Sequence, residues 1–193
     1  MTSEYQSFAW AAHPHEWMLV AEETHDQLKK LLEQRGRSYL EFKELAGASY
    51  RWDATDRLIF LLMAVVMENA IKSYLVYENP NWVSNGKLAK QLRTHDLIYL
   101  AAQSKKLPYK AKYKSFLMIL SEGFESWARY PCGLRSENLK PRKKFSKRYC
   151  EQYVLLIQSY GRKMKTLLSK DWEGAHGVRG RFDFTGDFFS FTV

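Results

Sequence analysis

Apolar side chains recur at intervals of three and four residues along most of the chain, which is the pattern of amphipathic helices. The first such run begins at Pro14, a residue tolerated in a first helical turn, and continues to about Gln34. A run over about 56–77 is apolar nearly all round in its first half, as expected for a helix enclosed by neighbours, and Asp53 or Thr55 can cap it. Further runs predict helices over about 110–127 and 149–167.

Three other segments carry weaker patterns. Residues 36–50 either extend the first helix or form a short second one. Residues 87–93 and 96–104 predict two short helices, with Thr94 placed to cap the second. From Asp171 onward glycines interrupt the chain, and its phenylalanines alternate with polar residues as in a short strand, so this tail either forms a hairpin or docks on a partner. The fold class expected is all-α: a bundle of about five helices with a short aromatic tail.

The expected organisation is a single core with extensions: an N-terminal extension over 1–13, a helical domain over 14–170 and a Gly/Phe-rich tail over 171–193. No signal peptide is visible, and the longest apolar run, 58–67, is half of the ~20 residues that span a bilayer. We therefore expect a cytoplasmic protein without a membrane partner. Cys132 and Cys150 lack zinc-site spacing and are expected to be free thiols.

The net charge of +9 favours anionic partners such as RNA or nucleotides. Six of the nine residues in 140–148 are basic. This segment is either a solvated helix start or part of an anion-binding surface. Its candidate basic patch comprises Arg142, Lys143, Lys144, Lys147 and Arg148.

Polar residues inside otherwise apolar helices are the first candidates for chemistry. Glu68, Asn69 and Lys72 interrupt the central helix, and the four-residue spacing lets Glu68 pair with Lys72. Such a pair is explained either by helix solubility or, because enclosed charges are costly, by a second role.

Two further groups lie at expected helix ends. His95 and Asp96 begin a helix, where Asp96 suits the positive end of the dipole and His95 suits a cap, a ligand or a base. Arg129 and Tyr130 end another, where an arginine is favourable with or without a phosphate. His95 has no second histidine nearby in sequence, so no metal site is expected.

Four segments in order, HEWMLVAEE (15–23), VMENAIKSYL (66–75), THDLIYL (94–100) and WARYP (127–131), resemble the HEPN domain family over roughly residues 14–168. The resemblance implies an up-and-down helical bundle, commonly a homodimer. Members include nucleotide-binding modules, partners of minimal nucleotidyltransferases in toxin-antitoxin pairs, and RNA-cleaving toxins or phage-defence proteins.

The chain departs from the nuclease branches of that family, which carry an Arg-x(4–6)-His motif. None of the five histidines has an arginine at that distance before it. Lys90 precedes His95 with four residues between them, but lysine lacks the planar, permanently charged fork of arginine. Dinucleotide-binding, P-loop, hydrolase-elbow and zincin motifs are also missing.

Three functional hypotheses remain. The favoured one is a HEPN-like module that binds a nucleotide or RNA phosphate between Lys72, His95 and Arg129, with Glu68 orienting Lys72 and no cofactor. The second is a divergent, metal-independent ribonuclease in which His95 is the general base and Arg129 stabilises the phosphorane. The third is a non-catalytic interaction protein that binds a partner chain through its tail.

Overall fold

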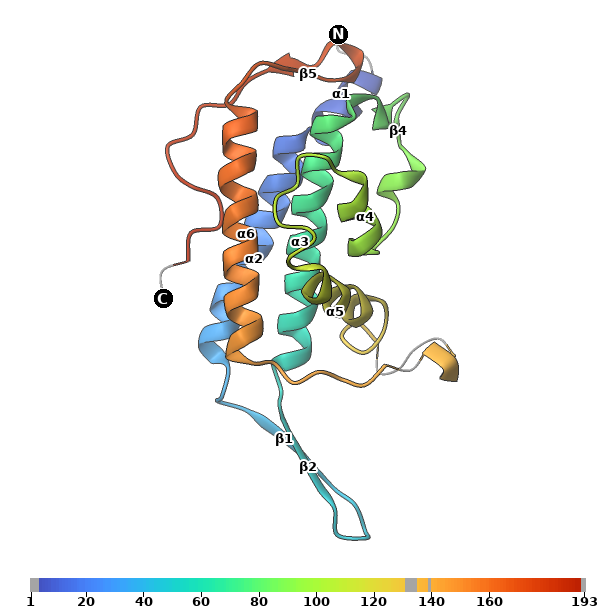
Figure 1. Ribbon diagram of the computed structural model, residues 1–193, viewed down its shortest axis with the longest axis vertical. Coiled ribbons are helices and arrows are strands. Elements are labelled where there is room, and N and C mark those ends of the chain that lie inside the picture. The colour runs from blue at the N-terminus through green and yellow to red at the C-terminus, as the bar shows by residue number, and fades with distance from the viewer. Residues whose placement is uncertain (1–3, 131–134, 139, 192–193) are drawn as a thin grey trace.

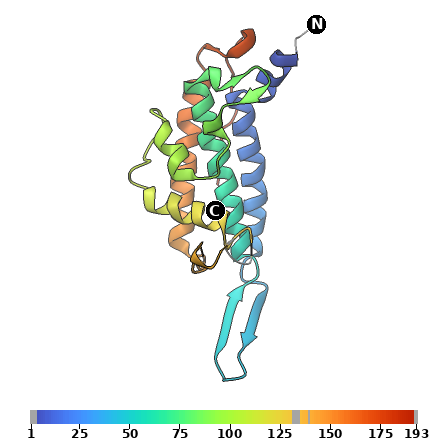
Figure 2. The ribbon, with the colours of Figure 1, turned by 90° about the vertical axis from the view of Figure 1, so that its right-hand side faces the viewer.

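Three long helices form the frame of the structure: α2 (Pro14–Gln34), α3 (Asp56–Glu78) and α6 (Lys147–Leu168). They lie side by side in a computed structural model, which describes residues 4–130, 135–138 and 140–191 (Figures 1 and 2). The short helices α4 (Leu97–Gln103) and α5 (Lys114–Glu125) pack on α3, and α1 (Glu4–Ala11) precedes α2. The described residues also form four 3₁₀ turns and three two-stranded hairpins: η1 (Pro80–Trp82), η2 (Lys90–Leu92), η3 (Ser136–Asn138), η4 (Ala175–Gly177), β1 (Tyr39–Lys43), β2 (Ser49–Asp53), β3 (Val83–Ser84), β4 (Lys87–Leu88), β5 (Trp172–Glu173) and β6 (Arg179–Gly180).

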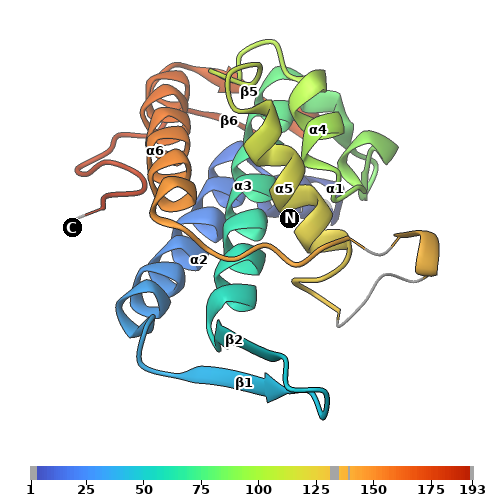
Figure 3. The same cartoon turned by 60° about the horizontal axis from the view of Figure 1, so that its bottom comes forward.

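The core lies around α3, which has neighbours on several sides (Figure 3). Met63, Met67 and Tyr74 on this helix are fully buried. By length and composition α3 could cross a membrane, but 78% of its most apolar window is buried inside the protein. Burial among the other helices explains its composition, and we assign it as the core helix of the bundle.

The predicted long helices are confirmed, and α2 has the predicted bounds. The start of α3 differs in one detail. Thr55 precedes the helix without a side-chain capping bond, whereas the Asp53 carboxylate accepts hydrogen bonds from the Thr55 amide and hydroxyl and from the Gly36 amide. Asp53 therefore ties the two ends of the segment that connects α2 and α3.

The prediction of helix within residues 36–50 is wrong, because this segment is the antiparallel β1–β2 hairpin. Its turn is closed by hydrogen bonds between Glu44 and Ala48 and between Gly47 and Glu44, and Gly47 takes a φ of +95° that favours glycine. The hairpin projects away from the bundle (Figure 1). Its large apolar residues alternate along the strands, which is a period of two rather than 3.6.

Residues 87–93 are not helical as predicted, since they form strand β4 and the 3₁₀ turn η2. The reason is the Asn85-Gly86 pair, in which both residues take positive φ and close a tight hairpin with β3. Helix α4 lies within the predicted 96–104. Its cap is Asp96 rather than Thr94, because the Asp96 carboxylate accepts from the Ile98 and Tyr99 amides.

The tail packs onto the chain's own helices. Its hairpin joins β5 to β6, while the phenylalanines predicted to alternate in a strand, Phe182, Phe184, Phe189 and Phe191, all lie outside strands. The Trp172 indole donates to the Tyr77 carbonyl, and the Phe189 amide donates to Glu22 of α2 at 2.6 Å. Phe189 itself is fully buried, so the tail covers part of the core.

Candidate functional site

Glu68 and Lys72 form a buried ion pair on α3. The Lys72 Nζ lies 2.6 Å from Glu68 Oε1, and less than a tenth of either side chain is exposed. The Lys72 ammonium also lies 5.5 Å from the centre of the Trp17 ring of α2. A buried pair is stable only when its remaining hydrogen-bonding capacity is satisfied, so the partner of the second Glu68 oxygen matters.

That partner is His95, which lies in the loop between η2 and α4. Its Nδ1 is 2.9 Å from Glu68 Oε2. A carboxylate accepts hydrogen bonds, so this contact assigns the proton to Nδ1 and leaves Nε2 as the nitrogen available to another molecule. The His95 side chain is 49% exposed, in contrast to the buried pair behind it.

Phe124, at the end of α5, joins His95 to Arg129. The His95 ring stacks on Phe124 with centroids 4.7 Å apart, and the Arg129 guanidinium lies 5.5 Å from the same ring. Arg129 also lies 5.2 Å from the Tyr130 ring. Among the residues that the structure describes, Arg129 forms no ion pair, so its exposed charge is available to an anion.

The structure thus brings together Glu68, Lys72, His95, Arg129 and Tyr130, with Phe124 at their centre; we call these six residues the His95 group. Lys72 lies in the interior and contacts Glu68 rather than solvent, because Glu68 neutralises its charge and the bundle buries it. Asn69 points elsewhere, since its amide donates to the Val65 carbonyl of its own helix. Asp96 is occupied in capping α4.

Two supporting residues were not anticipated from the sequence. Ser121 on α5 accepts a hydrogen bond from the Leu97 amide and lies 3.5 Å from the His95 carbonyl, which anchors the His95 loop. Glu125 lies near both His95 and Asp96: partial burial and Asp96 raise the pKa of its carboxyl, while His95 acts in the opposite direction. No sequence spacing identifies either residue, because both act across elements that are far apart in the chain.

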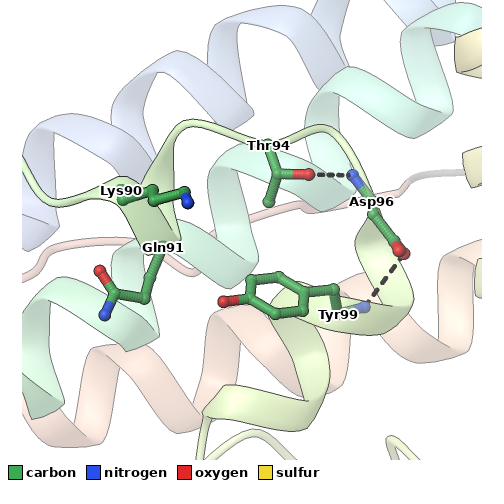
Figure 4. Close-up of a pocket in the computed structure, with 5 residues that line it drawn as sticks. All are labelled: Lys90, Gln91, Thr94, Asp96 and Tyr99. Atoms are coloured by element: carbon green, nitrogen blue, oxygen red, sulfur yellow. Dashed lines mark hydrogen bonds between the residues drawn. The ribbon is translucent and has the colours of Figure 1, made fainter.

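An open hollow of about 470 Å³ adjoins His95 in sequence and is lined by Lys90, Gln91, Thr94, Asp96 and Tyr99. Figure 4 shows Lys90 and Gln91 on one side and the Tyr99 ring across from them, with Thr94 bonded to the Asp96 amide. The hollow offers an amine, an amide and an aromatic ring next to the two chain neighbours of His95, Thr94 and Asp96.

The basic patch lies at the start of α3, where Phe60 contacts both Phe145 and Trp127. Phe145 in this segment is buried, its amide donates to Asp56 at the start of α3, and its carbonyl accepts from Arg35. Arg142 lies over the Trp52 ring of the hairpin, at 5.2 Å. Lys144, Lys147 and Arg148 are exposed and Lys143 is half-buried. The patch is thus fixed to the start of α3.

In the described parts of the chain, no three His, Cys, Asp or Glu side chains are grouped closely enough to hold a metal ion. Cys150 is a free thiol, and burial raises its pKa. Cys132 and Pro131, the last residue of the WARYP segment, lie outside the described residues.

Comparison with known proteins gives no relative: no protein-family model, curated protein or solved structure matches the chain significantly.

Proposed function

We propose that this protein is a HEPN-like module that binds the phosphate of a nucleotide or an RNA through His95 and Arg129. The observation that carries the proposal is the shared contact with Phe124, which holds an exposed imidazole and an exposed guanidinium against one ring. The order of the four HEPN-like segments and the net charge of +9 support it. Homodimer formation and a nucleotidyltransferase-like antitoxin partner belong to the same proposal.

Each residue of the His95 group has a role in this proposal. Arg129 offers the planar fork that suits phosphate oxygens, and His95 Nε2 offers one further polar contact. Glu68 fixes the orientation of the imidazole, and Lys72 compensates the Glu68 charge. Lys72 is thus a positioning residue here rather than a ligand contact, because its ammonium is buried.

Equilibrium binding of labelled RNA tests the proposal. Arg129→Ala is expected to weaken binding by about tenfold or more and to reduce the salt dependence by about one phosphate contact. Arg162→Ala on α6 is the matched control, because it removes an exposed arginine from another surface. Binding that stays the same in Arg129→Ala and His95→Ala would remove the proposal.

A second candidate function is metal-independent RNA cleavage, favoured by the Glu68–His95 hydrogen bond. A carboxylate that fixes one imidazole nitrogen and leaves the other exposed is the arrangement of a general base, and Arg129 lies where it can stabilise a phosphorane. In the presence of a metal chelator, RNA cleavage is expected to fall by roughly 10²–10⁴-fold in His95→Ala. A variant that cleaves as well as the parent would rule this function out.

The third hypothesis, partner binding through the aromatic tail, is less well supported. Phe189 is buried, and Phe182 and Phe184 contact His15 of α2, so the rings are occupied within the chain itself.

A further inference from the structure

One face of the β1–β2 hairpin consists only of large apolar side chains. Leu40 pairs with Trp52 and Phe42 with Tyr50, and cross-strand partners point to the same side of a sheet. We call these four residues the aromatic face. Leu40, Phe42 and Tyr50 are each about half exposed. The opposite side of the hairpin carries mostly polar residues: Tyr39, Glu41, Lys43, Ser49, Arg51 and Asp53.

Packing does not account for the aromatic face. The hairpin extends beyond the end of the bundle (Figures 1 and 2), and none of the four residues belongs to the described hydrophobic core. Cross-strand pairing of these side chains stabilises the hairpin modestly. Their outer surfaces nevertheless stay exposed, and a contiguous exposed apolar patch is typical of a binding site.

Positive charge borders this same face. The Arg142 guanidinium lies 5.2 Å from the Trp52 ring, which places the basic patch against the aromatic face. Partial burial and the neighbouring Arg57 lower the pKa of Arg142, so two guanidinium groups lie close together. Asp56, a carboxylate whose charge acts on Arg142, is already paired with Arg35 at 3.0 Å. The charge at the base of the hairpin therefore favours an anion.

We propose that the aromatic face and Arg142 form a base-stacking platform for single-stranded RNA. Flat exposed rings beside cations are the combination that holds unpaired bases and their phosphates, whereas a duplex hides its bases. The rings of Phe42 and Tyr50 are inclined by only 28°, with centroids 6.5 Å apart, so they offer neighbouring surfaces for stacking. A membrane surface fits less well, because Glu44 stands beside the exposed Leu45 at the hairpin tip.

This platform does not depend on the His95 group. Asp56, at the root of the hairpin, and Glu68 are twelve residues apart on α3, which corresponds to about 18 Å along the helix. The aromatic face and the His95 group share no residue, so substitutions can test each surface separately.

Fluorescence anisotropy with a labelled oligouridylate of about 12 nucleotides tests the platform in the full chain. Phe42→Leu combined with Tyr50→Leu retains apolar side chains on the strands but removes both flat rings. Tyr39→Leu is the matched control, since it removes a similarly exposed ring from the opposite side. Arg142→Gln removes the adjoining charge.

The double variant is expected to bind the oligonucleotide roughly tenfold or more weakly, whereas Tyr39→Leu stays within about twofold of the parent. Arg142→Gln is expected to weaken binding and lower its salt dependence, and a duplex of equal length is expected to bind the double variant as well as it binds the parent. The same ring dependence is expected in an Arg129→Ala background, which separates the platform from the proposed function of the His95 group.

Unchanged oligonucleotide binding in the double variant would overturn the proposal. So would a loss that Tyr39→Leu shares, because the effect would then belong to the hairpin and not to the aromatic face. Ring-dependent binding to phosphatidylserine vesicles, or ring-dependent self-association in sedimentation, with the oligonucleotide unaffected, would assign the face to a membrane or a second copy instead.

Discussion

Both oxygens of the Glu68 carboxylate accept hydrogen bonds, one from buried Lys72 and one from exposed His95. This single side chain thus connects the interior of the bundle to its surface. Its charge has a structural role and a functional role that substitutions can separate: the Lys72 contact concerns stability, and the His95 contact concerns the orientation of the imidazole.

Replacing Glu68 with glutamine is expected to lower the free energy of unfolding by ~3–5 kcal/mol, because it leaves the Lys72 charge buried without its partner. Urea denaturation measures this change. Glu151→Gln, in the exposed pair with Lys147, is the control and is expected to change stability by less than about 0.5 kcal/mol. Equal stabilities of Glu68→Gln and the parent would contradict the assignment of a buried pair.

Two buried histidines predict a pH dependence of stability. Burial, as the main cause, lowers the pKa of His13 and of His25 from 6.5 to about 4. The unfolded chain therefore takes up protons that the folded chain refuses, and stability falls as pH drops from about 6.5 to about 4. The loss is ~1.4 kcal/mol per pH unit and histidine over that interval. Glu22, whose pKa burial raises, opposes part of it.

Urea denaturation at pH 7 and pH 5 measures this slope. His25→Phe removes one titrating group from an aromatic environment that accepts a ring. Because burial also lowers the pKa of His15, the variant is expected to reduce the slope by less than half. A slope that is the same in the variant and the parent would show that His25 is not the buried neutral group described here.

Spacing along one helix predicts the Glu68–Lys72 pair, because residues four apart share a face. The remaining members of the His95 group depend on the path of the chain between helices. His95 reaches Glu68 from a loop that Ser121 anchors to α5, and Phe124 has the sequence pattern of an ordinary apolar position on α5. Contacts between different elements follow no regular spacing in the sequence, so the sequence pattern does not predict them.

At the scale of elements, close approach between α6 and the tail depends on Gly161. A Cβ added at this position would lie 2.8 Å from Phe188 Cβ and 3.1 Å from the Phe188 carbonyl oxygen. Backbone atoms cannot yield as the end of a flexible side chain does. Glycine at this position therefore lowers the intrinsic stability of α6 but allows the tail to pack closely against the helix.

Gly161→Ala is expected to displace the tail and lower stability by ~1–3 kcal/mol despite the better helix propensity of alanine. Limited proteolysis, which cleaves exposed tails first, and the thermal midpoint measure the two effects. Gly180→Ala is the control, because a Cβ at that position meets open space. A more stable Gly161→Ala protein with a protected tail would refute the close approach.

Helices with a buried stripe were predictable because burial imposes the 3.6-residue period, as in α2 and α6. The hairpins escaped prediction for two reasons. β1 and β2 are mostly exposed, so no buried face marks them, and β3 and β4 have only two residues each. The phenylalanines of the tail alternate with polar residues in the sequence, which led to the prediction of a strand. In the structure they lie outside strands.

For the molecule as a whole, the two appendages differ in what they contribute. The β1–β2 hairpin extends into solvent from a root held by Asp53, while the tail lies along the bundle and places Phe189 in the core (Figure 1). The first adds surface and the second completes the interior. The tail is therefore expected to contribute more to stability than the hairpin.

Replacing residues 39–52 with a short Gly/Ser linker is expected to change the free energy of unfolding by less than about 1 kcal/mol. Deleting residues 171–193 is expected to lower the free energy of unfolding by at least ~3 kcal/mol. The deletion removes the apolar contacts that Trp172, Val178 and Phe189 make with the core, and it exposes the core surface that they cover. Calorimetry on both variants makes the comparison. Loss of cooperative unfolding in the hairpin variant, or an undiminished midpoint without the tail, would reverse the assignment.

The hydrogen bond between the Phe189 amide and Glu22 joins residues 167 positions apart. A ribosome adding about 5–20 residues per second needs roughly 10–30 s to travel that distance, whereas a helix forms within about a microsecond. Throughout that interval the tail is not yet present to cover its side of α2. The order of synthesis thus makes α2 the first long helix to be completed, and leaves the histidine-bearing side of α2 among the last surfaces to be covered.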